Sequence, residues 1–173
     1  MNHKTILINL LLFVCLLFCG CEKWMEDHLG RTIVCFKNNA EYGISVYSAM
    51  TPPYDPSSPI YPDTSLPIQL PSVIDISSHD YRVIIDTRDE LSEIYTEFQT
   101  DTMSFFILST EQLSSRNWDY IRTSYKILQR YDISRDDFLS LKQYPVFPPS
   151  EEMRNIKMWP PYGTYDANGN RVK

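Results

Sequence analysis

Proline placement constrains this sequence more than any other feature. All twelve prolines lie in two segments, seven between positions 52 and 71 and five between 145 and 161. Proline lacks a backbone N–H and fixes φ, so neither segment suits the interior of a helix or a sheet. We expect 52–71 to be an extended surface loop rather than a proline-motif ligand. Residues after 144 should strap over a domain, with at most one helical turn at 151–156.

The first twenty residues are typical of a membrane-directed leader. After a polar start that contains Lys4, residues 5–18 are apolar except for Thr5 and Asn9. These fourteen residues are too few to span the hydrocarbon layer of a membrane, which needs about 20. They suit the apolar region of a secretory signal peptide. A soluble secreted protein and an uncleaved anchor helix remain open as alternatives.

The apolar run is followed by Gly20 and Cys21, a small residue directly before a cysteine. This pair resembles the lipobox of bacterial lipoproteins, in which the chain is cut before a cysteine that becomes lipid-modified. Cys21 is the predicted acceptor, and Cys19 is the rival, although a bulky phenylalanine precedes it. Attachment by two or more acyl chains would be stable. We therefore expect a lipoprotein signal peptide at 1–20, and a lipidated cysteine with a polar tether at 21–30.

Charge and cysteine content exclude one class of partner and one kind of crosslink. The chain has 22 acidic and 16 basic residues, a net charge of −6, and no basic cluster of the kind that nucleic acid requires. An aromatic fraction of 13% indicates a packed core rather than a disordered chain. Beyond the leader and Cys21, only Cys35 remains, so no internal disulfide can form. Its apolar surroundings favour a buried core thiol over an intermolecular bridge.

Strand signals dominate the middle of the chain. Runs of β-branched and aromatic residues predict strands at 32–36, 43–48, 72–76 and 80–86. The first two should form an antiparallel pair, because paired asparagines between them favour a turn. A capping box from Thr87 to Glu90 predicts a helix that begins at Arg88. Residues 102–108 are apolar on both faces, which is typical of a strand covered on both sides. The intervening connection suits a parallel βαβ unit.

Two helices are predicted in the C-terminal half. Asn117 can cap a helix over 117–131, and its apolar stripe should bury against the sheet. The stripe consists of Trp118, Ile121, Tyr125 and Leu128. Truncating Trp118 should then cost about 3 to 5 kcal/mol, as it does for other buried large aromatic residues. A second capping box, formed by Ser134 and Asp137, predicts the next helix.

Two C-terminal stretches carry a family resemblance, KILQRYDIS at 126–134 and NIKMWPPY at 155–162. Together with YPDTSLP upstream, they resemble a family of small uncharacterised lipoproteins from Bacteroides-type (Bacteroidetes) gut bacteria. The similarity covers residues 61–162, with gaps. It implies a lipid-anchored envelope protein of a Gram-negative anaerobe. It implies no catalytic residue, because the family has no assigned activity.

The polar residues that could carry chemistry form no recognisable catalytic or metal motif. Only His28 and His79 follow the leader, too few for a multi-histidine metal site. In an extended segment, His79 and Asp80 would point to opposite faces. The acidic residues between 86 and 93 suit a helix N-terminus, and 166–170 suits an Asn-Gly turn better than a calcium loop. We predict no cofactor and no metal site.

Aromatic side chains in the proline-rich segments are the remaining candidates for binding. Trp159, Tyr162 and Tyr61 lie in stiff stretches, where a ring loses little entropy on contacting a protein or a glycan. The same rings could instead cover the core of the domain. For Trp159 this packing role is the favoured interpretation.

These elements predict one α+β domain at 31–162, with an exposed tail at 163–173. We expect a mixed sheet of about five strands and about three helices, two of them in the C-terminal half. The alternative is a β-sandwich with appended helices. For function, we expect a non-enzymatic, lipid-anchored envelope protein with an interaction or structural role and the membrane as one partner. A periplasmic immunity or inhibitor protein with one dedicated protein partner is the alternative, and a hydrolase is the third hypothesis.

Overall fold

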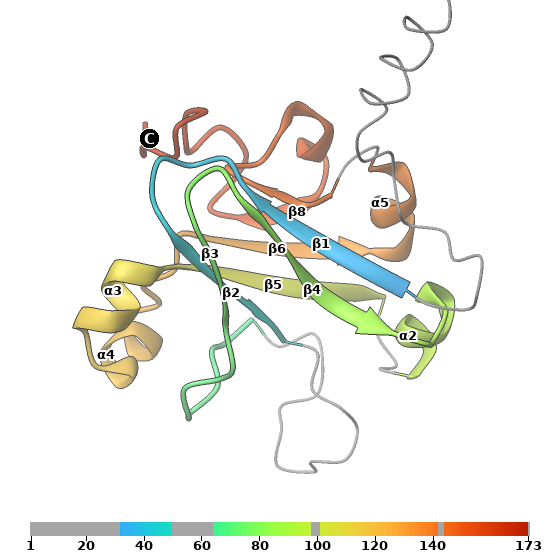
Figure 1. Ribbon diagram of the computed structural model, residues 1–173, viewed down its shortest axis with the longest axis horizontal. Helices are drawn as coiled ribbons and strands as arrows, with labels where there is room; N and C mark the ends of the chain where they lie inside the picture. The colour runs from blue at the N-terminus through green and yellow to red at the C-terminus, as the bar shows by residue number, and fades with distance from the viewer. Residues whose placement is uncertain (1–31, 50–63, 98–100, 142–143, 173) are drawn as a thin grey trace, which may run out of the picture.

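The computed structural model describes residues 32–49, 64–97, 101–141 and 144–172. This part of the chain is an α+β domain, as predicted, but it contains two sheets rather than one mixed sheet. Figure 1 shows the sheets stacked face to face, with two helices near each end of the stack. The alternative of a sandwich with appended helices therefore describes the layers better. Among the described residues, no helix has the length and apolar character needed to span a membrane.

The larger sheet is antiparallel throughout, in the order β3-β2-β5-β6-β8. Its strands are β2 (Ile44–Ser48), β3 (Ile74–Ile76), β5 (Thr102–Ser109), β6 (Gln129–Ser134) and β8 (Lys157–Trp159). The central strand, β5, is buried at every position except its first and last. This confirms the prediction of a strand covered on both faces.

The smaller sheet has the order β4-β1-β7. It consists of β1 (Thr32–Asn38), β4 (Tyr81–Thr87) and β7 (Val146–Phe147). The predicted antiparallel pair of β1 with β2 is wrong, because the two strands belong to different sheets. The predicted βαβ unit is wrong for the same reason, since β4 and β5 also lie in different sheets. In both cases the chain crosses from one layer to the other, and all four strands contribute side chains to the core between the sheets.

The main core fills the space between the two sheets. Phe36 of β1 lies with its ring centroid 6.4 Å from that of Phe105 and 6.0 Å from that of Tyr131, both on the larger sheet. Phe138 packs edge-on against Phe105 from one end. A second, smaller core covers the outer face of the larger sheet. Its buried members are Ala49, Leu66, Phe106, Leu108 and Ile121.

The described residues contain four α-helices and a 3-10 turn, against three helices predicted. They are α2 (Leu91–Glu97), α3 (Thr110–Ser115), α4 (Trp118–Thr123), α5 (Arg135–Ser140) and the turn η1 (Glu151–Met153). Two predicted caps are confirmed. The Asn117 side chain accepts a hydrogen bond from the Asp119 N–H at the start of α4, and Ser134 with Asp137 forms the reciprocal capping box of α5. The turn η1 lies inside the predicted 151–156 segment.

The predicted helix over 117–131 is wrong beyond Thr123, where α4 ends. After α4 the chain turns at Tyr125, whose φ is +50°, and residues 129–134 form β6. Pairing with β5 explains the outcome, because it buries Tyr131 and Ile133 in the main core and satisfies the backbone at the same time. The helical spacing of Tyr125 and Leu128 is therefore a coincidence.

The predicted start of α2 is displaced. The Thr87 hydroxyl donates to the Asp89 carboxylate, while the Glu90 N–H donates to the carboxylate of Glu93. The Glu93 carboxylate thus makes the capping contact that was expected of the Glu90 carboxylate. The helix accordingly begins at Leu91 rather than Arg88.

The C-terminal segment is docked on the domain, so the prediction of an exposed tail at 163–173 holds for only half of its described residues, Ala167, Asn168, Asn170, Arg171 and Val172. Thr164 is buried, and the Tyr42 hydroxyl donates to the Gly169 carbonyl at 2.6 Å. Burial raises the pKa of Tyr42 to about 12. The predicted Asn-Gly turn is present, with the Asp166 carboxylate accepting the N–H groups of Asn168 and Asn170. Gly169 has a φ of +86°, and a Cβ there would lie 2.7 Å from the Ala40 side chain.

Truncation of one aromatic residue in each core tests whether the main core contributes more to stability than the second core. Trp118 was predicted to be buried but is partly exposed at the second core, where its indole N–H donates to the Pro67 carbonyl. Phe138 is fully buried in the main core. We expect Phe138→Ala to cost about 3 to 5 kcal/mol in urea unfolding, and Trp118→Ala to cost clearly less. An equal or larger loss of stability in Trp118→Ala would contradict this difference between the cores.

Candidate functional site

The outer face of the larger sheet carries a group of polar and aromatic side chains from neighbouring strands. In the antiparallel register, Arg130 lies opposite Trp159 and Asp132 lies opposite Lys157. Side chains alternate across a strand, so these four share one face, while Tyr131 lies on the other face, in the main core. Together with two neighbours they form what we call the outer-face cluster, which consists of Ser104, Tyr125, Arg130, Asp132, Lys157 and Trp159.

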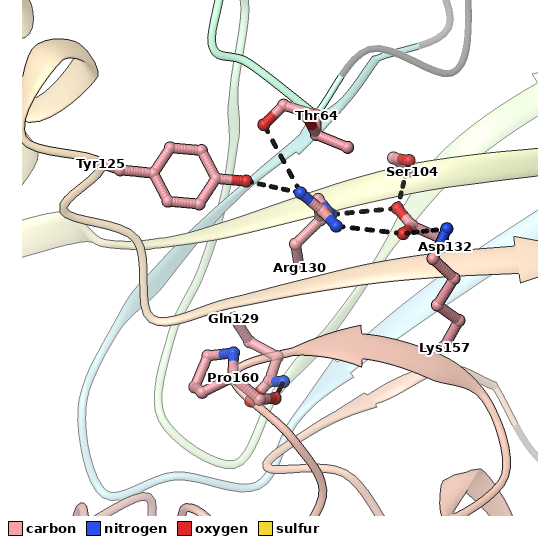
Figure 2. Close-up of polar contacts among 8 residues, drawn as sticks. All are labelled: Thr64, Ser104, Tyr125, Gln129, Arg130, Asp132, Lys157 and Pro160. Carbon is pink, nitrogen blue, oxygen red and sulfur yellow. Dashed lines mark hydrogen bonds and ion pairs between the residues drawn. The ribbon is translucent and has the colours of Figure 1, made fainter.

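Asp132 is the centre of the cluster and is only 3% exposed. The Ser104 hydroxyl donates to its Oδ1 at 2.5 Å. Arg130 approaches both carboxylate oxygens, with Nε 3.1 Å from Oδ1 and Nη2 3.2 Å from Oδ2. The Lys157 ammonium lies 3.6 Å from Oδ2 (Figure 2). Two cations and a hydroxyl thus compensate the burial of one carboxylate.

Arg130 connects this carboxylate to two other parts of the chain. Its Nη1 donates to the Tyr125 hydroxyl at 2.8 Å and approaches the Thr64 carbonyl at 3.5 Å. Figure 2 shows the guanidinium between these partners and Asp132. Arginine suits this position because its planar head carries five donors in a fixed arrangement. The side chain is consequently held in one place, with 11% of it exposed.

Trp159 and Lys157 are the most exposed members of the cluster. The ring of Trp159 packs edge-on against Tyr125, with centroids 5.1 Å apart, yet the residue is 45% exposed. The Lys157 side chain is 75% exposed. Behind them, the fully buried Gln129 donates from Nε2 to the Pro160 carbonyl, which secures the backbone directly after Trp159. One indole and one ammonium therefore stand side by side on a supported surface.

Tyr162, the other predicted site residue that the structure describes, does not join this cluster. Tyr162 instead donates to Glu151, beneath the guanidinium of Arg154, whose carbon lies 5.3 Å from the ring centroid. This hydrogen bond, with a second from Arg154, lowers the pKa of the Glu151 carboxyl. Cys21 and Tyr61 lie outside the described residues. Trp159 packs against Tyr125 with part of its ring and exposes the rest, so its binding role stays a prediction.

Sequence reasoning missed Arg130, Asp132, Ser104 and Lys157. The predicted helix covered 117–131 and so concealed the alternation in QRYDIS at 129–134, where polar residues at 130 and 132 share one face of a strand. That alternation was the signal that could have found the site.

Other polar groups lie apart from the cluster. His79 is exposed and lies 3.5 Å from a carboxylate oxygen of Glu41. An open depression beside α2 is lined by Asp89, Ser92, Glu93 and Thr96. Within the described ranges, no three His, Cys, Asp or Glu side chains gather as they would around a metal ion. Cys35 is buried, as predicted.

The chemistry of the outer-face cluster suits binding better than proton transfer. A general base must accept a proton from its substrate, but both oxygens of Asp132 already face cationic groups. The most exposed groups are an indole and an ammonium, which make stacking, cation–π and ionic contacts.

Comparison with known proteins finds no matching family model, no matching curated protein and no matching solved structure. Function has therefore to be inferred from the chemistry of the outer-face cluster and from the N-terminal sequence.

The buried carboxylate makes a stability prediction possible. Asp132→Asn should leave Arg130 without its counter-charge, and removing one member of a buried ion pair costs about 3 to 5 kcal/mol. Lys157→Met is the matched control, since it removes an exposed partner of the same carboxylate and should change stability by no more than about 0.5 kcal/mol. Urea unfolding of the two variants checks both values. Wild-type stability of Asp132→Asn would show that the ion pair is not structural.

Proposed function

We propose that this protein is a lipid-anchored cell-envelope protein, attached through Cys21, that binds a partner through the outer-face cluster and catalyses no reaction. The observation that carries the binding role is the exposed pair of Trp159 and Lys157, held on a fixed polar network. The location is the envelope, either the outer membrane at its periplasmic face or the cell surface. The resemblance to Bacteroides-type lipoproteins supports the same location.

The anchor is supported by the sequence around Cys21. A short apolar run, a small residue and a cysteine follow one another, and a mainly polar stretch comes next. Ten residues separate Cys21 from Thr32, where β1 begins. Even fully extended, this connection reaches at most about 40 Å. The domain would therefore remain close to the membrane surface.

Pre-organisation supports the binding role. Tyr125 packs against Trp159, and Arg130 holds Tyr125 through its hydroxyl. A side chain that is already fixed loses little entropy when a partner arrives. Exposed tryptophan is also a frequent centre of binding energy in interfaces. The partner class that fits an aromatic ring beside a cation is a protein or a glycan with polar or acidic groups.

The anchor predicts the behaviour of a single variant. Cys21→Ala should abolish incorporation of labelled fatty acid and release the protein from the membrane fraction, because no other cysteine would follow a small residue at the end of the leader. Metabolic labelling and fractionation measure both effects. Continued labelling of Cys21→Ala would contradict the assignment, while loss of labelling only in Cys19→Ala would move the anchor by two residues.

The binding role predicts selective loss of a partner. Crosslinking in intact cells, followed by recovery of the protein, should capture a partner with the wild type and several-fold less with Trp159→Ala or Lys157→Ala. Tyr81→Ala is the matched control, because Tyr81 is a comparably exposed aromatic residue on β4 of the other sheet. Equal loss with all three variants would reject the outer-face cluster as the binding surface. Recovery of one partner protein in a one-to-one ratio with this chain would indicate the immunity or inhibitor role.

A further inference from the structure

A second exposed surface is formed by residues 67–71, which we call the apolar tip. No charged residue occurs between positions 64 and 74. Within the tip, Ile68 is 81% exposed and Leu70 is 55% exposed, and a proline stands at each side. Two exposed aliphatic side chains on one short segment without charge make the tip a candidate contact surface.

The structure supports the tip in its exposed position. Directly before it, Leu66 is buried in the second core. The indole N–H of Trp118 donates to the Pro67 carbonyl at 3.1 Å. Val73, just after the tip, packs against the same core. Figure 1 shows this green segment projecting beyond the sheets on the side away from the C-terminus. Leu66 and Val73 are thus held against the second core, while Ile68 and Leu70 lie exposed between them.

The neighbouring helix adds groups that favour a membrane interface. Trp118 of α4 contacts the tip directly, and the same helix exposes Tyr120. The Arg116 guanidinium lies 5.3 Å from the centroid of the Tyr120 ring. Tryptophan, tyrosine and arginine combine an apolar body with a polar end, and they concentrate where lipid headgroups meet acyl chains.

We propose that the apolar tip inserts into the outer acyl region of the phospholipid bilayer to which the chain is anchored, with Trp118 and Tyr120 at headgroup level. This inference rests on the proposed lipid anchor at Cys21. A convex tip with two aliphatic side chains would need a matching pocket on a protein, whereas a bilayer adapts to it. The anchor keeps Thr32, where β1 begins, within about 40 Å of the lipid, so the effective concentration of the domain at the bilayer is high. With the anchor in place, two aliphatic side chains suffice to hold the tip in the bilayer. Without the anchor, the same two side chains would attach the domain to lipid only weakly.

A fluorescent label in the tip tests insertion. The lipid-anchored protein carrying Gln69→Cys, labelled with a polarity-sensitive fluorophore, is reconstituted into vesicles of phosphatidylethanolamine and phosphatidylglycerol, and flotation is measured first. We expect flotation, a blue-shifted emission at least twofold brighter than in solution, and quenching by lipids that carry a quencher in their acyl chains. A label at Tyr81→Cys, an exposed position on the other sheet, should show none of these spectral changes.

A matched variant separates insertion from an effect of the label itself. Ile68→Ser with Leu70→Ser, added to Gln69→Cys, should float equally well but lose the blue shift. Flotation without a shift at position 69, or a shift that survives in the serine variant, overturns insertion while the anchor stands. Failure to float overturns both. A shift that appears without vesicles, as protein concentration rises, would instead place a second copy of the chain on the tip and reject the lipid.

Discussion

The burial of β5 on both faces is the constraint on which the rest of the structure depends. From Met103 to Leu108 every side chain is withdrawn from water, so each face needs its own cover. On the inner face, Phe105 requires the second sheet, and Phe36 of β1 supplies the ring it packs against. On the outer face, Phe106 requires a separate cover, which α4 provides through Ile121 and the proline-rich segment provides through Leu66. The burial of β5 on both faces therefore accounts for the second sheet on one side and the second core on the other.

The outer-face cluster begins where this apolar cover ends. Along β5 the outer face changes from Phe106 to Ser104, and Ser104 donates to Asp132 on the neighbouring strand. A buried carboxylate is tolerated only when opposite charges and donors surround it, and Arg130 meets that need in a two-point contact. The same guanidinium holds Tyr125, and Tyr125 holds the ring of Trp159. The exposed binding groups are thus positioned by a chain of contacts that starts from the sheet.

Local features were predictable from the sequence, and long-range pairings were not. The caps at Asn117 and Ser134 and the two-faced burial of 102–108 depend on neighbouring residues alone, and all three are confirmed. The sheet to which a strand belongs depends on partners far along the chain. An alternating pattern is the same in either sheet, so β1 and β2 were paired wrongly. Of the site, Trp159 was found because it is an aromatic residue in a proline-rich segment. Arg130 and Asp132 were missed because a helical stripe ended where a strand begins.

Residue-resolved hydrogen exchange under native conditions tests most directly whether β5 organises the domain. Amides of β5 should exchange only when the whole domain unfolds, so their opening free energy should equal the free energy of unfolding measured with denaturant. Amides of α3 and α4, which cover only the second core, should exchange through smaller openings while β5 stays protected. If the β5 amides instead exchange as readily as those of β4 at the edge of the smaller sheet, the central place assigned to β5 is wrong.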